Sequence, residues 1–108
     1  MTDSSNTSDD RLKQRDGNLS DVLDSLEKMN CFRFHFKRTY DDHQRIGMSA
    51  QEIMAIYPEI VSTFNNPDDK EEYYNIEVYG LTTLAIQACK ELHAKVKALE
   101  DRVKTLEE

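Results

Sequence analysis

The sequence lacks the features that mark membrane, secreted and nucleic-acid-binding proteins. No apolar run approaches the roughly 18 residues that a membrane span needs, and the N-terminus has no apolar core of a signal peptide. Acidic residues predominate, with 21 Asp and Glu against 14 Lys and Arg and a net charge of −7. This balance argues against nucleic acids and anionic membranes as partners, because both require a basic face on the protein. We therefore expect a protein that is made, and works, in a cytoplasm-like compartment.

Cysteine is also scarce, and Cys31 and Cys89 are the only two in the chain. They lie on different predicted elements and do not form the disulfide framework that stabilises small secreted domains. The three histidines, His35, His43 and His93, are scattered and do not combine with the cysteines into a metal site. We expect reduced thiols, no metal and no cofactor.

The chain is short, and its 108 residues have room for one small domain. Hydrophobic residues make up 38% of it and charged residues 32%. Small domains bury a smaller share of their surface than large ones, so a single copy would bury only a modest core. Some of the stability is therefore expected to come from association.

The N-terminal third predicts a polar start, a helix and a strand. Residues 1–10 are polar and acidic after the initial methionine, a composition typical of disorder. A helix is predicted over 20–29, where Ser20 is a suitable N-cap and apolar residues recur at helical spacing. Over 31–40, alternating phenylalanines predict a half-buried strand, with residues 41–44 as the turn that follows. Its aromatic side chains are interpreted as core residues: Phe32, Phe34 and Phe36.

The middle of the chain predicts a second helix and a hairpin. Ser49 and Glu52 have the spacing of a capping box, and Pro58 ends the helix that they begin. Two short strands, 59–64 and 73–78, flank a turn rich in Asn, Pro and Asp. We therefore predict an α+β fold with a small antiparallel sheet, short helices and a long C-terminal helix forming a coiled coil.

The C-terminal helix is predicted over 81–108, a segment that contains no glycine or proline. Its apolar residues narrow to the two seam positions of a coiled-coil heptad, and Lys95 and Arg102 face Glu100 and Glu107 of the neighbouring strand. The alternative is an amphipathic helix packed on its own domain, which usually has a wider apolar face. Valine and leucine at alternate seam positions favour a dimer over a trimer. The predicted oligomerisation residues are Ala85, Cys89, Leu92, Val96, Leu99, Val103 and Leu106.

Three segments form a pattern in this order and spacing: 8–13 (SDDRLK), 46–53 (IGMSAQEI) with 57–61 (YPEIV), and 79–81 (YGL). Together they resemble the peptidase S74 family, the intramolecular chaperone domain of endosialidases. Similar modules end phage tail fibres and neck appendages and occur in myelin regulatory factor. The first segment is similar to the opening motif of the family and the second to its central motif, and the third lies at the start of the final helix. The chain departs from the pattern after the opening motif, where the usual Asn-Ile is absent, and at Ser49.

The resemblance implies a self-cleaving serine peptidase. Carried over, Ser8 is the nucleophile, Lys13 is its base, and the bond between Thr7 and Ser8 is cut. A serine hydroxyl needs a neighbouring base, and a lysine serves as one only when its amine is neutral, which burial favours. Assembly of three chains would supply that burial. Gln51 and Glu52 are candidates for supporting the pair. On spacing alone, a solvated serine and an exposed lysine are the better explanation of these residues, and only the other two motifs in register favour the catalytic pair.

These expectations combine into one function. The chain is predicted to be a homotrimeric chaperone that helps an upstream β-structured fibre or tailspike domain of the same polypeptide to fold, and then releases itself. We expect residues 1–7 to be an upstream linker, 8–80 the chaperone and autoprotease core, and 81–108 the coiled coil. The work would take place in the host cytoplasm, with the parent protein in the virion tail. Two alternatives remain: a non-catalytic trimerisation module, and the self-cleaving module of a membrane-anchored transcription factor.

Overall fold

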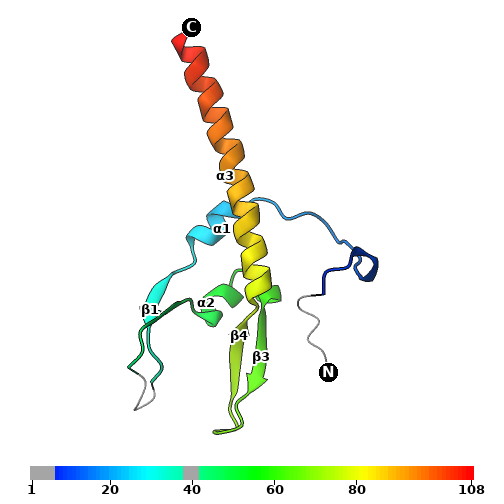
Figure 1. Ribbon diagram of the computed structural model, residues 1–108, viewed down its shortest axis with the longest axis vertical. Coiled ribbons are helices and arrows are strands. Elements are labelled where there is room, and N and C mark those ends of the chain that lie inside the picture. The colour runs from blue at the N-terminus through cyan, green and yellow to red at the C-terminus, as the bar shows by residue number, and fades with distance from the viewer. Residues whose placement is uncertain (1–6, 38–41) are drawn as a thin grey trace. The chain divides into compact units, whose positions relative to one another are not determined.

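The structure, a computed structural model, describes residues 7–37 and 42–108. It has two small antiparallel sheets, short helices and one long helix (Figure 1), which confirms the predicted α+β class. Positions 38–41, where the first predicted strand ends and its turn begins, lie outside the described residues. The elements follow in the order η1 (Asp10–Leu12), α1 (Leu23–Glu27), β1 (Phe32–Phe34), β2 (Arg45–Gly47), α2 (Ala50–Met54), η2 (Pro58–Ile60), β3 (Val61–Asn65), β4 (Glu72–Ile76) and α3 (Val78–Glu107).

The chain divides into two compact units. One contains the N-terminal segment up to Asp24 together with Val78–Glu108, and the other is the continuous segment Ser25–Glu77. The first unit therefore brings the opening motif and the long helix into one body, although they are far apart in sequence. The sequence-based division stays a prediction: 1–7, 8–80 and 81–108.

In the second unit, α2 and the short turn η2 supply the buried residues. The Ser49 hydroxyl oxygen accepts a hydrogen bond from the Glu52 backbone N–H at 3.3 Å, so the predicted helix cap is present. Ile53 and Ile60 are 1% and 7% exposed and are the core residues that this unit contributes. Helix α2 ends at Met54, with Ala55 as its C-cap, and so stops before Pro58, which was predicted to end it. Pro58 instead begins η2, and the strand that follows starts later than predicted.

The predicted hairpin is confirmed. Strands β3 and β4 pair antiparallel from Val61 opposite Ile76 to Asn65 opposite Glu72. In the turn between them, Lys70 adopts a φ of 60°, in the left-handed region that residues other than glycine rarely occupy. The turn therefore joins the strands by placing one non-glycine residue in an unfavourable backbone conformation.

The first sheet differs from the prediction. Strand β1 is shorter than expected and pairs with β2, which the sequence analysis did not predict. Phe32 and Phe36 are 39% and 47% exposed, so the prediction that they are core residues is wrong. The rings instead pack edge to face on Phe34, with centroids 6.1 Å and 5.3 Å apart. Two strands cannot bury both of their faces unless another layer covers them.

The first helix is also shorter than predicted. The backbone of Asp21 has a φ of 55°, which is not helical, and α1 begins only at Leu23. Ser20 is exposed and lies outside the helix, so its predicted role as N-cap is wrong. The intervening Val22 is completely buried, at 0% exposure. The turn at Asp21 thus directs the next residue into the interior.

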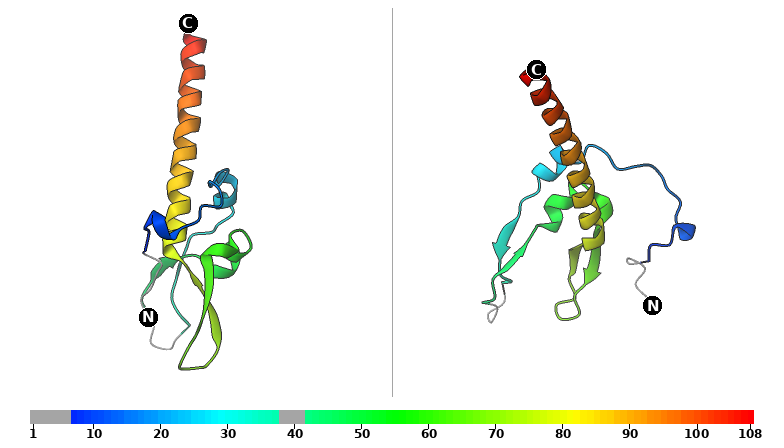
Figure 2. Two further views of the ribbon diagram at one scale, coloured as in Figure 1. Left: turned by 90° about the vertical axis from the view of Figure 1, so that its right-hand side faces the viewer. Right: turned by 45° about the horizontal axis from the view of Figure 1, so that its top comes forward.

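Helix α3 is a single uninterrupted helix (Figure 2) and begins at Val78, slightly before the predicted start. The hydroxyl groups of Thr82 and Thr83 donate to the carbonyl oxygens of Val78 and Tyr79, at 2.8 Å and 3.0 Å, within its first turns. Leu84 and Ala88 are its buried residues. Across the described ranges, no helix combines the length and the apolar character that a membrane crossing requires.

Candidate functional site

A tight turn near the N-terminus positions the two residues predicted to form the catalytic pair. Asp9 caps η1, and its Oδ1 accepts the backbone N–H of Arg11 at 2.9 Å. The backbone N–H groups of Leu12 and Lys13 donate to the carbonyl oxygens of Asp9 and Asp10 at 3.0 Å and 3.2 Å. This geometry folds residues five apart in sequence back onto one another.

The turn brings Ser8 and Lys13 together. Lys13 Nζ donates a hydrogen bond to Ser8 Oγ, and the two atoms are 2.8 Å apart. This is within the distance over which a base can take a proton from a nucleophile. Ser8, Lys13 and Thr7 are all exposed in the single chain. The pair is therefore in hydrogen-bond contact and is exposed to water in the single chain.

Asp9 and Arg11 hold this turn, and the sequence analysis gave neither of them a role. The Arg11 guanidinium contacts both carboxylate oxygens of Asp9, with Nη2 2.8 Å from Oδ2 and Nε 3.1 Å from Oδ1. The hydrogen bonds from the Arg11 side chain and backbone lower the pKa of Asp9, and the same contact raises the pKa of Arg11. An aspartate directly before a short turn, with a basic residue inside that turn, is the signal that could have identified them.

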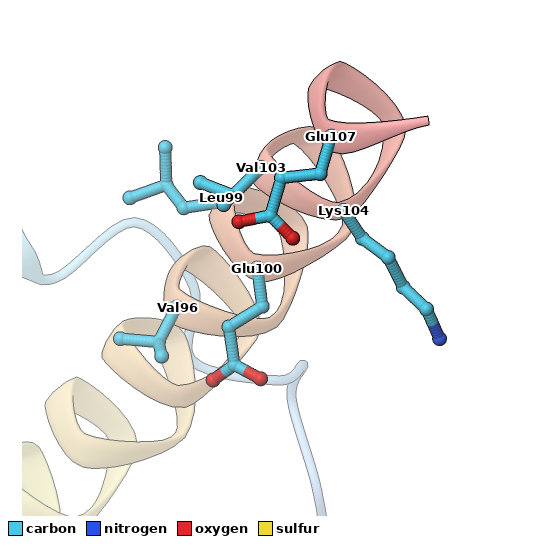
Figure 3. A pocket seen from close by; sticks show the side chains of 6 residues that line it. All are labelled: Val96, Leu99, Glu100, Val103, Lys104 and Glu107. Carbon is cyan, nitrogen blue, oxygen red and sulfur yellow. The ribbon is translucent and has the colours of Figure 1, made fainter.

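The predicted oligomerisation seam is exposed along α3. All seven of its residues are exposed, and Leu92, Val96, Leu99 and Val103 keep about half of their surface, at 51%, 49%, 56% and 53%. Figure 3 shows Val96, Leu99 and Val103 projecting to one side of the helix while Lys104 points away from it. Because burial of apolar surface is favourable, this stripe is suited to contact with another helix. A separate face of α3 carries its buried residues, Leu84 and Ala88.

The remaining candidates include the two residues predicted to support the pair, Gln51 and Glu52. Glu52 Oε1 accepts a hydrogen bond from Asn30 Nδ2 at 2.7 Å, and the Gln51 side chain is exposed. Both belong to the second unit, and their support of the pair stays a prediction. Cys31 and Cys89 are exposed free thiols. Within residues 7–37 and 42–108, no three His, Cys, Asp or Glu side chains gather as a metal site would require.

Comparison with known proteins identifies the family to which the chain belongs. The family model described as the chaperone of endosialidase matches residues 8–62, about half of the chain. The match begins at Ser8 and includes Lys13 and all of α2. No curated protein matches the chain. The match supports a role as an intramolecular chaperone, and the chain belongs to the peptidase S74 family.

Proposed function

We propose that the protein is an intramolecular chaperone that trimerises through the seam of α3 and then cuts its own Thr7–Ser8 bond with Ser8 and Lys13. The observation that carries this proposal is the hydrogen bond of 2.8 Å between Lys13 Nζ and Ser8 Oγ, at the residue where the family match begins. The family match therefore begins at a serine whose hydroxyl is in contact with a lysine amine, which supports the proposed roles of nucleophile and base.

The chemistry balances with these two side chains and one water molecule. A neutral Lys13 amine takes the Ser8 hydroxyl proton as Oγ attacks the Thr7 carbonyl carbon. The C–N bond between Thr7 and Ser8 breaks, a C–O ester forms, and the lysine returns its proton to the departing Ser8 nitrogen. Water then hydrolyses the ester and leaves a carboxylate on Thr7 and a free amine on Ser8. Attack within one chain needs little further machinery, because a well-aligned intramolecular reaction has lost much of its entropic barrier, about 7–11 kcal/mol in favourable cases.

Assembly is the step that would activate the pair. In the single chain Ser8 and Lys13 are exposed, and a solvated amine holds its proton at neutral pH. Docking of three chains would exclude water from the pair and favour the neutral amine. Cleavage would then occur only in correctly assembled molecules.

The exposed seam supports association. A helix as long as α3 gains much of its stability from packing an apolar face, and the seam has no such packing within the chain, since every one of its residues is exposed. In a parallel arrangement, Lys95 would meet Glu100 and Arg102 would meet Glu107 of the neighbouring copy. Three copies are proposed because of the family, since alternating valine and leucine alone favour two.

The chaperone would act on a phage fibre or tailspike domain in the same polypeptide. Holding three chains in register lowers the entropic cost of starting an intertwined β-structure, whose non-local contacts form slowly. Removal of the module after folding would make assembly kinetically hard to reverse. The parent protein would be part of the virion tail, and assembly would take place in the host cytoplasm. Neither nucleic acid nor membrane is needed as a partner.

A second candidate function is a trimerisation module without catalysis. The exposure of Ser8 and Lys13 favours it, because a pair that stays in water would keep its amine protonated. This candidate shares the seam of α3 with the first and differs only in the fate of the Thr7–Ser8 bond.

Intact mass spectrometry distinguishes the two candidates. A folded reporter of known mass is fused upstream of Met1, and the wild type is compared with Ser8→Ala and Lys13→Ala. We expect a new fragment that begins at Ser8 in the wild type only. Light scattering on the same samples is expected to give trimers for all three proteins.

Matched controls and alternative outcomes make the test decisive. Ser20→Ala and Lys28→Ala replace an exposed serine and an exposed lysine outside the turn, and both should be cut like the wild type. An uncut trimer in every sample would reject the peptidase and retain the assembly module. An uncut monomer would reject both candidates.

A further inference from the structure

The N-terminal arm, which we define as residues 7–21, is exposed along its whole length, and burial begins abruptly at Val22. At that residue the chain is fastened to α3. The backbone N–H of Val22 donates to both carboxylate oxygens of Glu91, at 3.0 Å from Oε1 and 3.3 Å from Oε2. The root of the arm is thus held by a side chain that lies 69 residues away in the sequence.

Neighbouring groups hold the Glu91 carboxylate in place for its contact with Val22. Gln87 Nε2 donates to Glu91 Oε2 at 3.0 Å. Hydrogen bonds from the Gln87 side chain, and from backbone N–H groups near Val22, lower the pKa of Glu91 against the opposing effect of desolvation. A carboxylate that accepts an N–H makes a stronger hydrogen bond than a neutral acceptor does. The contact therefore uses the ionised form of Glu91, with Gln87 fixing its orientation.

The backbone beside this contact is strained. Asp21 adopts a φ of 55°, a conformation that costs free energy in a residue other than glycine and persists only where its surroundings enforce it. Asp21 is itself exposed, whereas the next residue, Val22, is fully buried. The burial of Val22 and its hydrogen bond to Glu91 are the interactions that hold the chain in this turn.

The contact between Val22 and Glu91 lies next to the predicted seam of α3. Glu91 directly precedes the seam residue Leu92, but it occupies a heptad position outside the contact surface between helices. The chain between Lys13 and Val22 extends at most about 30 Å. The catalytic pair is therefore tethered within a limited distance of the place where neighbouring copies would pack.

We propose that Glu91 is a positioning residue for self-cleavage: by binding the Val22 N–H it anchors the arm on α3 beside the seam and confines the Ser8–Lys13 pair to the subunit contact. This inference rests on the proposed function. A released arm would search a larger volume, and the effective concentration of the pair at its completed site would fall. Because Glu91 lies outside the seam, its substitution should leave trimers intact.

The test compares Glu91→Ala and Glu91→Gln with Asp101→Asn, which removes an exposed carboxylate elsewhere on α3. Amide hydrogen exchange at Val22 reports the anchor without any need for cleavage. We expect exchange to rise about tenfold in Glu91→Ala and less in Glu91→Gln, which keeps an oxygen acceptor. The cleavage rate of the upstream fusion should fall in the same order, by about tenfold for Glu91→Ala. Asp101→Asn should match the wild type in both measurements.

Each other outcome has a distinct meaning. Unchanged exchange at Val22 in Glu91→Ala would show that no anchor exists. Faster exchange with an unchanged cleavage rate would overturn the positioning role while leaving the peptidase intact. A loss of trimers in the Glu91 variants would mean that the residue acts through assembly, which also contradicts the proposal. An uncut wild type would reject the peptidase, and the positioning role with it.

Discussion

Asp9 illustrates how one side chain can set the geometry of a turn that brings two other side chains, Ser8 and Lys13, into contact. Its carboxylate caps η1 and binds the Arg11 guanidinium, and the turn that results places Lys13 Nζ 2.8 Å from Ser8 Oγ. All of these residues are exposed, so each single contact contributes little to stability. Their combined effect is conformational, because the capped turn is what brings two residues five apart in sequence into contact.

The pKa of Asp9 allows this turn to be tested by pH. Because hydrogen bonds from Arg11 lower the pKa of Asp9 in the folded turn, the ionised form stabilises the turn. That contribution is complete above the ordinary aspartate pKa of about 3.9 and is lost as the pH falls through the lowered folded pKa. We expect the Asp9 carboxyl carbon to titrate by NMR with a midpoint below that ordinary value.

Arg11→Ala is the control for this measurement. Removal of the guanidinium should move the Asp9 midpoint back toward the ordinary value and should weaken the contact between Lys13 and Ser8. A midpoint that is the same with and without Arg11 would contradict the assigned cause of the pKa shift.

At the scale of elements, the local signals of the β3–β4 hairpin and of the α2 cap predicted the structure correctly, whereas the Ser20 cap failed and pairing with distant partners was missed. The hairpin of β3 and β4 was predicted because its turn residues and alternating strands act locally. Strand β2 was missed, because it is only three residues long and includes a glycine, and such a segment becomes a strand only when another pairs with it. The expected burial of the phenylalanines in β1 failed for a related reason, since alternation shows that a strand has two faces but not whether either is covered.

Gly47, in β2, gives a prediction at this scale. A Cβ atom at this position would lie 2.7 Å from Cε1 of the Phe34 ring, which real structures do not tolerate. Gly47→Ala should therefore displace the ring from its contacts with Phe32 and Phe36 and destabilise the second unit by about 1–3 kcal/mol, as overpacking does. Urea unfolding measures this change.

A double-mutant cycle identifies the cause. If the clash with Phe34 is responsible, Gly47→Ala should cost almost nothing in a Phe34→Ala background. An equal cost in both backgrounds would mean that the backbone of β2, and not the ring, requires the glycine.

At the scale of the whole molecule, α3 presents two faces with different roles. One carries Leu84, Ala88 and Glu91 and is occupied by the chain itself, whereas the seam is exposed from Ala85 to Leu106. The heptad pattern predicted a continuous apolar stripe, and its residues are exposed in the single chain, while their role in association stays a prediction. The pattern could not predict the contact between Glu91 and Val22, because a hydrogen bond to a distant backbone N–H leaves no periodic signal.

The pairing of Ser8 with Lys13 was suggested only by the family resemblance, since their spacing fits neither a helix nor a strand.

The seam makes a prediction about assembly. Leu99→Asp places a charge at the centre of the seam, and burying an unpaired charge is costly. We expect this variant to be monomeric by sedimentation equilibrium and to lose helical circular dichroism, because an isolated helix is marginal in water. Ala98→Asp, an exposed neighbour outside the seam, should remain trimeric. Association that is unaffected by Leu99→Asp would show that the copies meet through another surface.

The contact between Lys13 and Ser8 has a further consequence for the product of cleavage. Cutting the Thr7–Ser8 bond would convert an uncharged amide nitrogen into the α-amino group of Ser8. Such groups are largely protonated below a pKa of about 8, and this one would share a residue with the hydroxyl that Lys13 binds. A second amine would then lie beside the contact between Lys13 and Ser8. It would compete with Lys13 for the Ser8 hydroxyl and loosen the turn, so cleavage would change the conformation of the arm.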